Sequence, residues 1–162
     1  MTVKIKLNGG IMPQKATAGA AAYDLYVPEE TVVKSNRQVI DLKFSIELPH
    51  GYAATIQPRS GFSAKGMEMV CSRRVDDINI EWNERVDADV TRGLIDCDYR
   101  GNVGVIIYVK GDLSLGTTYT LLKGTRIAQM QIIEVPQVEL VEVDELSDTD
   151  RGEGGFGSTG TK

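Results

Sequence analysis

The chain has 162 residues, of which 41% are hydrophobic and 25% are charged, as in a single globular domain with one buried core. The net charge of −5 argues against broad electrostatic binding of nucleic acid, and no apolar run approaches the roughly 18 residues of a membrane span. Two cysteines, Cys71 and Cys97, are too few for a disulfide framework, and the only histidine, His50, lies in a turn. We therefore expect a reduced, cytoplasmic protein without a histidine base.

Short strands separated by turns account for most of the chain. Segments of five to eight residues, rich in Val, Ile and Tyr, alternate or run apolar at 3–7, 43–48, 51–57, 103–109, 118–122 and 126–133. Gly, Pro, Asn or Asp falls between most of them, and residues 60–66 offer one short turn of helix at most. This pattern predicts an all-β sandwich, barrel or jelly roll.

A charged segment, Cys71 to Asp89, interrupts this pattern and contains the only tryptophan. Three of its residues alternate as in a strand: Ile78, Ile80 and Trp82. Three residues, in and just after the segment, have helical spacing: Trp82, Val86 and Val90. We favour a β-hairpin arm for this segment.

The stretch PRSGFSAKG carries the first group of chemical side chains. Arg59 offers a planar fork of donors, Ser60 a hydroxyl, and Gly61 close approach of a backbone N–H. Between a strand and a helix start, this combination suits phosphate oxygens. The simpler interpretation is that Ser60 only caps a helix.

The stretch GLIDCDYRGNVGVIIYV places acidic residues beside an apolar run. Asp96 follows Leu94 and Ile95, so its carboxylate can lie in partly dry surroundings and serve as a base or as a water-positioning group. Residues 98–101 are typical of a tight turn. The alternative is a hairpin whose aspartates bond only to nearby backbone N–H groups.

Gln129 stands between Ala128 and Met130 in a nearly continuous apolar stretch. A buried amide needs hydrogen-bond partners, so Gln129 either satisfies backbone groups or faces a ligand. The two interpretations are left open.

The acidic residues 141–150 are typical of a linker, and they lead into the closing sequence RGEGGFGSTGTK. Arg151 can pair with a phosphate, Phe156 offers a flat face for a base, and Ser158 adds a hydroxyl donor. The glycines allow such a segment to fold over a ligand and to release it. The alternative is a frayed terminus.

Five stretches, taken together and in this order, resemble the motifs of the trimeric deoxyuridine triphosphatases (dUTPases): AAAYDLYV, PRSGFSAKG, GLIDCDYRGNVGV, KGTRIAQM and RGEGGFGSTG. They extend over nearly the whole chain, and the third and fifth are long and specific. The resemblance implies a jelly-roll or β-clip barrel, a homotrimer that shares three active sites, and exchange of C-terminal arms. Residues 1–149 would form the body, with 71–89 as an inserted arm, and residues 150–162 would form a flexible lid.

The resemblance also implies the reaction. The enzyme would be a dUTP diphosphatase that hydrolyses dUTP to dUMP and diphosphate, which limits uracil in DNA and supplies dUMP for thymidylate synthesis. Asp96 would orient or deprotonate the water that attacks the α-phosphorus. Tyr99 would lie under the deoxyribose and leave no room for a 2′-hydroxyl. Mg²⁺ would be held mainly by the triphosphate and waters, with Asp24 near those waters.

The remaining residues would bind the substrate. Arg59, Ser60 and Gly61 would hold the phosphates, with Gln129 beside them. Backbone groups near Leu94 and Ile95 would read the uracil. The lid of a third subunit would place Arg151 at the γ-phosphate and Phe156 over the base, with Gly157 and Ser158 beside them.

Some positions depart from the family pattern. Ala22 replaces a usual glycine, Thr125 replaces a usual aspartate, and the 71–89 segment is absent from compact members. Two alternatives follow. One is a dUTP-binding regulatory protein that docks a partner through an arm containing Trp82. The other is a dCTP deaminase of the same fold, which the intact third and fifth motifs disfavour.

Overall fold

The computed structural model describes residues 1–33, 37–110 and 116–155, and within these the chain forms three four-stranded antiparallel sheets. The first sheet has the order β1 (Lys4–Leu7), β4 (Gln38–Glu47), β10 (Asn102–Val109), β8 (Ala88–Val90). The second has the order β3 (Thr31–Val33), β11 (Thr118–Leu121), β6 (Met67–Val75), β7 (Ile78–Val86). The third has the order β2 (Tyr23–Tyr26), β12 (Arg126–Glu134), β5 (Tyr52–Gln57), β9 (Gly93–Ile95). One short helix, α1 (Ser60–Lys65), follows β5.

The core forms where the inward faces of these sheets meet. Strand β4 alternates buried and more exposed positions, and its inward residues are Ile40, Leu42, Phe44 and Ile46. Strand β10 contributes Val103, Val105, Ile107 and Val109 in the same way. Each such side chain stabilises the fold by about 1.5–3 kcal/mol relative to an exposed one. The alternation in the sequence therefore decides which face of each strand turns inward.

The all-β prediction is confirmed. Five of the six predicted strands match to within one residue at each end, and the short helical turn is α1. The sixth, predicted at 43–48, is the second half of β4, which begins five residues earlier, at Gln38. Sequence analysis missed β2, β3, β8 and β9, which have only three or four residues each. Among the described residues, no helix is long and apolar enough to span a membrane.

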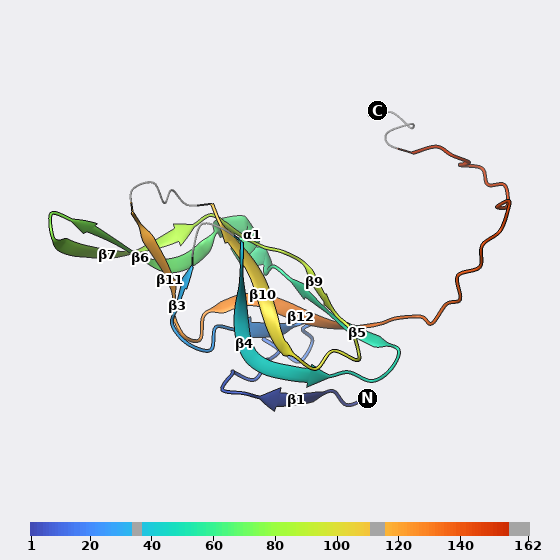
Figure 1. The fold of residues 1–162 in the computed structure, drawn as a ribbon, viewed down its shortest axis with the longest axis horizontal. Helices are drawn as coiled ribbons and strands as arrows, with labels where there is room; N and C mark the ends of the chain where they lie inside the picture. The colour runs from blue at the N-terminus through green and yellow to red at the C-terminus, as the bar shows by residue number, and fades with distance from the viewer. Residues whose placement is uncertain (34–36, 111–115, 156–162) are drawn as a thin grey trace.

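The predicted hairpin is confirmed as β6 and β7, which pair from Met67↔Val86 to Val75↔Ile78 and project from the body (Figure 1). Its turn residues, Asp76 and Asp77, have φ of 47° and 66°, the left-handed conformation that a two-residue hairpin turn requires. The helical spacing in this segment has no counterpart in the structure. The hairpin begins before residue 71, and residues 88–90 belong to β8 in another sheet.

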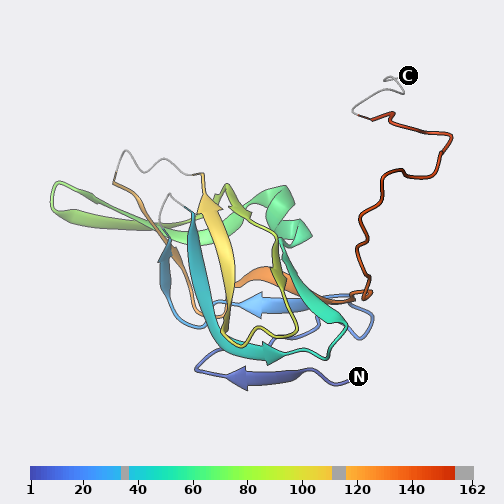
Figure 2. The same cartoon turned by 45° about the vertical axis from the view of Figure 1, so that its right-hand side comes forward.

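After Glu134 the chain leaves the body, on the side away from the hairpin (Figures 1 and 2). Residues 135–155 contain no strand or helix, and most of their side chains are exposed. Several of these side chains are apolar: Val138, Leu140, Val141, Val143 and Leu146.

Candidate functional site

The segment from β5 into α1 lines a polar cavity of about 280 Å³. Its lining includes four predicted site residues and the predicted metal-side aspartate: Arg59, Ser60, Gly61, Gln129 and Asp24. Gly61 faces open space, so its backbone is accessible to a ligand. The predicted phosphate-binding residues therefore lie together around one cavity.

Asp24 connects two arginines at this cavity. It is 7% exposed, and one carboxylate oxygen accepts a hydrogen bond from Arg59 Nε at 2.9 Å. The other oxygen accepts from Arg126 Nη1 at 3.2 Å. Because Nε is taken by Asp24, the Nη groups of Arg59 remain as donors for an anion. Sequence analysis named Asp24 but missed Arg126, whose signal is a charged residue at the start of a buried strand.

Gln129 lies on β12, opposite both Asp24 and Gln57 in the sheet register. Its Nε2 donates a hydrogen bond to the Pro58 carbonyl oxygen at 3.1 Å, and it also lines the cavity. The interpretation that Gln129 satisfies a backbone group is confirmed, while its role toward a ligand remains a prediction. The bond to Pro58 fixes the backbone directly before Arg59, which stabilises the entry into α1.

A second cavity of about 400 Å³ adjoins the first and shares Arg59 and Gly61 with it. Three further cationic side chains line it: Lys65, Arg85 and Arg126. Arg85 comes from the hairpin and lies 3.7 Å from Glu68. Because cations outnumber the single acidic lining residue, this region attracts anions. Sequence analysis named neither Lys65 nor Arg85 as a site residue, although Lys65 lies in the stretch PRSGFSAKG.

The third-motif residues lie elsewhere on the same chain. Strand β9 pairs antiparallel with β5, with Ile95 opposite Ala54, and Asp96 follows β9. Asp96 is exposed, so the partly dry surroundings expected from the sequence are not present within one chain. Ala54 and Gln57 are ~10 Å apart along β5. Asp96 lies beyond the Ala54 end of this stretch and Arg59 lies beyond the Gln57 end. Within one chain, Asp96 and the phosphate cavity are therefore not brought together.

Tyr99 lies in the turn after β9, where its backbone N–H donates to the Asp96 carbonyl oxygen at 3.2 Å. Its side chain is 45% exposed. Leu94 is also exposed, and Ile95 is buried. Strand β9 ends its sheet, so one of its edges presents unpaired backbone groups that a ligand can use.

Of the predicted lid residues, Arg151 is described, and it belongs to the segment after β12 that runs away from the body (Figure 2). Its Nε donates to the Gly154 carbonyl oxygen at 2.7 Å. Phe156, Gly157 and Ser158 lie outside the described residues.

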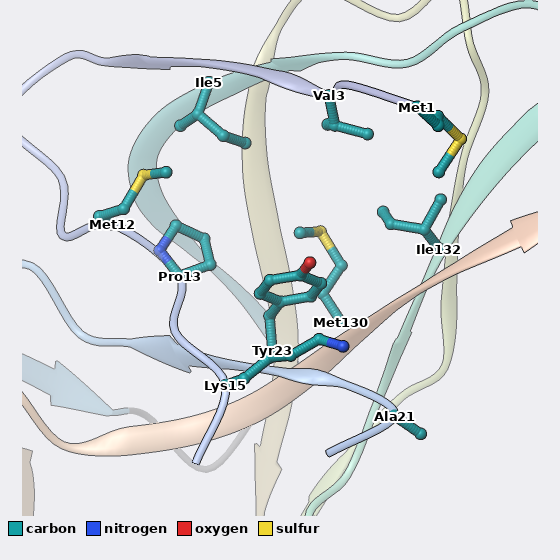
Figure 3. Close-up of a pocket in the computed structure, with 10 residues that line it drawn as sticks. All are labelled: Met1, Val3, Ile5, Met12, Pro13, Lys15, Ala21, Tyr23, Met130 and Ile132. Atoms are coloured by element: carbon teal, nitrogen blue, oxygen red, sulfur yellow. The ribbon is translucent and has the colours of Figure 1, made fainter. Parts of the chain in front are cut away.

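An apolar cavity of about 370 Å³ lies between β1, β2 and β12 and shares Ala21 with the polar cavity (Figure 3). Met130 and Ile132 of β12 and Tyr23 of β2 line it. In β12, Met130 lines this cavity while its neighbour Gln129 lines the polar one, as alternation along a strand requires.

The donor set does not form a protein cage for a metal ion. Among the described residues, no three His, Cys, Asp or Glu side chains are grouped as metal ligands. Asp24 is held by two guanidinium groups, so its charge is already compensated. The predicted place of Asp24 near magnesium waters remains a prediction.

The two cysteines differ in environment. Burial, and then the nearby Glu84 carboxylate, raise the pKa of the Cys71 thiol. Cys71 is fully buried, whereas Cys97 is partly exposed, one residue from Asp96. Cys71 therefore remains a protonated core residue and carries no chemistry.

The fold and the site define an all-β protein with a cationic cavity that suits phosphate groups and, away from it on the same chain, a loop that carries Asp96. The dUTPase family model matches residues 8–81 and 80–160, two segments that meet inside the β6–β7 hairpin. The chain is 38% identical to the deoxyuridine 5'-triphosphate nucleotidohydrolase of Beijerinckia indica subsp. indica, over 94% of this chain and 85% of that protein. It is also 38% identical to the deoxyuridine 5'-triphosphate nucleotidohydrolase of Hydrogenobaculum sp., over 100% of this chain and 99% of that protein. This chain belongs to the dUTPase family.

Solved structures of phage dUTPases have the same fold. The Staphylococcus bacteriophage 80alpha dUTPase with dUPNHPP is similar with a TM-score of 0.76 and 26% identity, over 98% of each chain. Phage dUTPases are described with that structure as controlling the transfer of virulence genes. A mutant form of the dUTPase of phage phi11 of S. aureus has a structural Mg(II) ion. Its likeness, with a TM-score of 0.71 and 23% identity over 90% of this chain and 98% of that one, concerns the fold alone.

Proposed function

We propose that this protein is a dUTP diphosphatase that hydrolyses dUTP to dUMP and diphosphate. The observation that carries the proposal is the polar cavity in which Asp24 orients Arg59 beside Ser60 and Gly61, in a chain of the dUTPase family. This cavity suits a triphosphate because Arg59, which keeps its Nη donors beside the Nε bond to Asp24, and the exposed Gly61 backbone both line it.

In the proposed reaction, Asp96 accepts a proton from a water molecule whose oxygen attacks the α-phosphorus. The bond from the α-phosphorus to the bridging oxygen breaks, and diphosphate leaves. The exposure of Asp96 supports this role because a water molecule can reach its carboxylate. In this family context, Tyr99 packs under the sugar and excludes a ribose 2′-hydroxyl.

Uracil would be recognised by the backbone of Leu94 and Ile95. The position of β9 at the edge of its sheet supports this assignment, because an edge strand has free N–H and C=O groups.

The proposed site is shared between subunits of a homotrimer. The opposite directions of Asp96 and Arg59 on one chain support this arrangement, since one triphosphate group cannot contact both within a single subunit. Arg59, Ser60, Gly61 and Gln129 would come from one subunit, and Asp96 and Tyr99 from a second.

The lid of a third subunit would complete the site by arm exchange. Residues 135–155 support this role because they run away from their own body with apolar side chains exposed. Arg151 would contact the γ-phosphate, and the glycine-rich end would close over the base with Phe156, Gly157 and Ser158. Deletion of residues 150–162 is expected to leave a folded protein of unchanged oligomeric state with little turnover. Full activity of the truncated protein would contradict this role.

Magnesium would enter with the substrate, held mainly by the triphosphate oxygens and waters. The absence of a carboxylate cage around Asp24 in the described residues accords with such an ion, which keeps much of its hydration. When bound, the ion supplies charge neutralisation to the phosphates. Chelation is expected to abolish turnover and leave the melting temperature of the free protein unchanged.

The test of the function is diphosphate release from dUTP, with dTTP, dCTP and UTP as competitors and Asp96→Asn as the variant. We expect selective turnover of dUTP that is lost in the variant. Ammonia release from dCTP would instead identify a deaminase, and tight dUTP binding without turnover would identify a nucleotide-binding regulator.

A second function is favoured by the hairpin. One face of β6 and β7 carries Val75, Ile78 and Ile80, all exposed, in continuation of a buried apolar base. We propose this face as a docking surface for a regulatory protein, with half-buried Trp82 at its inner end.

Replacement of Ile78 and Ile80 by serine distinguishes a surface that docks a partner from a surface that forms the subunit interface. Unchanged oligomeric state and dUTP turnover would leave the face available for a partner. Dissociation of the oligomer would assign it to the subunit interface instead.

A further inference from the structure

The position of the Tyr99 ring depends on a hydrogen bond more than on packing. The side chain is 45% exposed, and its hydroxyl donates to the backbone carbonyl oxygen of Asn102 at 2.9 Å. The ring end lies against Gly101, where an added Cβ would stand 2.4 Å from the Tyr99 oxygen. The Tyr99 ring therefore keeps this position only if the backbone carbonyl group of Asn102 stays in place.

The Asn102 side chain is anchored from two other strands. Its Oδ1 accepts hydrogen bonds from Asn8 Nδ2 at 2.8 Å and from Ser45 Oγ at 3.2 Å. Its Nδ2 donates to Asp41 Oδ2 at 3.0 Å. Asn8 follows β1, and Asp41 and Ser45 belong to β4, which neighbours β10 in the sheet. We call these four residues the Asn102 cluster.

The cluster is itself held by an irregularity in the sheet. Asn102 pairs with Ser45 but Gly104 pairs with Asp41, so β4 has extra residues in a bulge between these positions. Within the bulge, Lys43 has a φ of 54°, and its backbone N–H donates to Asp41 Oδ1 at 2.7 Å. The bulge thus aims the Asp41 carboxylate at Asn102, and bulges are often found where a side chain must be aimed.

We propose that Asn102 is a positioning residue for sugar selectivity. Through its anchored backbone carbonyl it fixes the Tyr99 hydroxyl, and so it sets how closely the ring approaches the 2′ carbon of the sugar. A steric filter works only if the wall cannot retreat, and displacement of a wall by about 1 Å is enough to admit a hydroxyl group. The inference rests on the proposed function, in which Tyr99 packs under the deoxyribose.

The test compares kcat/KM for dUTP and UTP in the full-length protein and in Asn102→Ala. The ratio of the two values is expected to fall about tenfold, mainly through faster use of UTP, because the anchoring hydrogen bonds are lost. Asn83→Ala is the matched control, an exposed asparagine on β7 outside the cluster, and it should leave the ratio unchanged. An unchanged ratio in Asn102→Ala would overturn the inference.

A double-mutant cycle gives a readout that a merely structural role would not move. Tyr99→Phe removes the hydroxyl donor and keeps the ring, so it should lower the same ratio. In the Tyr99→Phe background, Asn102→Ala should change selectivity no further. Independent, multiplicative effects of the two changes would contradict positioning through this bond. If Asn102→Ala does not fold, Ser45→Ala removes one bond from the cluster and is expected to shift the ratio in the same direction.

The outcomes separate this inference from the proposed function. No preference of the unmodified protein for dUTP, or a preference that Tyr99→Ala leaves intact, would refute the role of Tyr99 itself. A preference that Tyr99→Ala abolishes and Asn102→Ala retains would refute only the positioning role of Asn102.

Discussion

Replacement of Asp24 by asparagine perturbs the ion pairs that hold the phosphate cavity. The Asp24 side chain is 10% exposed, while those of Arg59 and Arg126 are 28% and 49% exposed. Asparagine keeps the shape but removes the charge, and one of its two terminal atoms becomes an NH₂ donor that faces a guanidinium donor. Two cations then lack a counter-charge.

The expected loss of stability follows from this burial. Removal of one partner from a fully buried ion pair costs about 3–5 kcal/mol, and the partial exposure of both arginines reduces this to about 2 kcal/mol. For a domain of this length, that loss lowers the melting temperature by about 4–8 °C. The KM for dUTP should also rise about tenfold, since Arg59 loses its orientation.

Asp77→Asn is the matched control for this measurement. Asp77 pairs with Arg74 at 2.8 Å, but the Asp77 side chain is 91% exposed, and asparagine tolerates its left-handed backbone. Scanning calorimetry should show a change of less than about 2 °C for the control. Equal melting temperatures for the two variants would refute the structural role of the buried carboxylate.

Three further experiments test the fold. Gly10→Ala would place a Cβ 2.3 Å from a carbonyl oxygen of β4, so we expect denaturant titration to show a loss of more than about 2 kcal/mol in the free energy of unfolding. The control, Gly19→Ala, places a Cβ that meets nothing within 4 Å and should cost less than about 0.5 kcal/mol. Asp77→Gly should raise the melting temperature, because glycine adopts the positive φ of 66° without strain; a decrease would contradict the turn geometry. In thiol labelling of the native protein, Cys97 should react and Cys71 should not, since burial shields Cys71 and raises its pKa; two fast thiols would contradict its burial.

Sequence reasoning reached most of the fold because alternation reports burial directly. In β4 and β10 the apolar positions that alternate in the sequence are those that point into the core. Strands such as β8 and β9, with three residues each, are too short to show a period, and they exist because longer neighbours pair with them. The helical spacing of Trp82, Val86 and Val90 misleads because Val86 and Val90 are buried from two strands of different sheets, β7 and β8, and not from one face of a helix.

The candidate site was predictable where a motif concentrates its residues in one turn. Arg59, Ser60 and Gly61 are adjacent in the sequence and line one cavity. The Arg59–Asp24–Arg126 bridge was not predictable, because its members are distant in the sequence and meet only through the pairing of β12 with both β2 and β5. The anchoring of Asn102 by Asn8 and β4 depends on a bulge that leaves no periodic signal.

Subunit mixing tests whether a working site of the proposed homotrimer combines Arg59 of one subunit with Asp96 of another. Arg59→Gln and Asp96→Asn should each be inactive toward dUTP. After co-refolding in equal amounts, random trimers should regain activity at about a quarter of their sites, where an intact Arg59 meets an intact Asp96 across an interface. If both residues acted within one chain, every chain in the mixture would lack one of them. The mixture would then remain as inactive as its components, which would contradict the shared site.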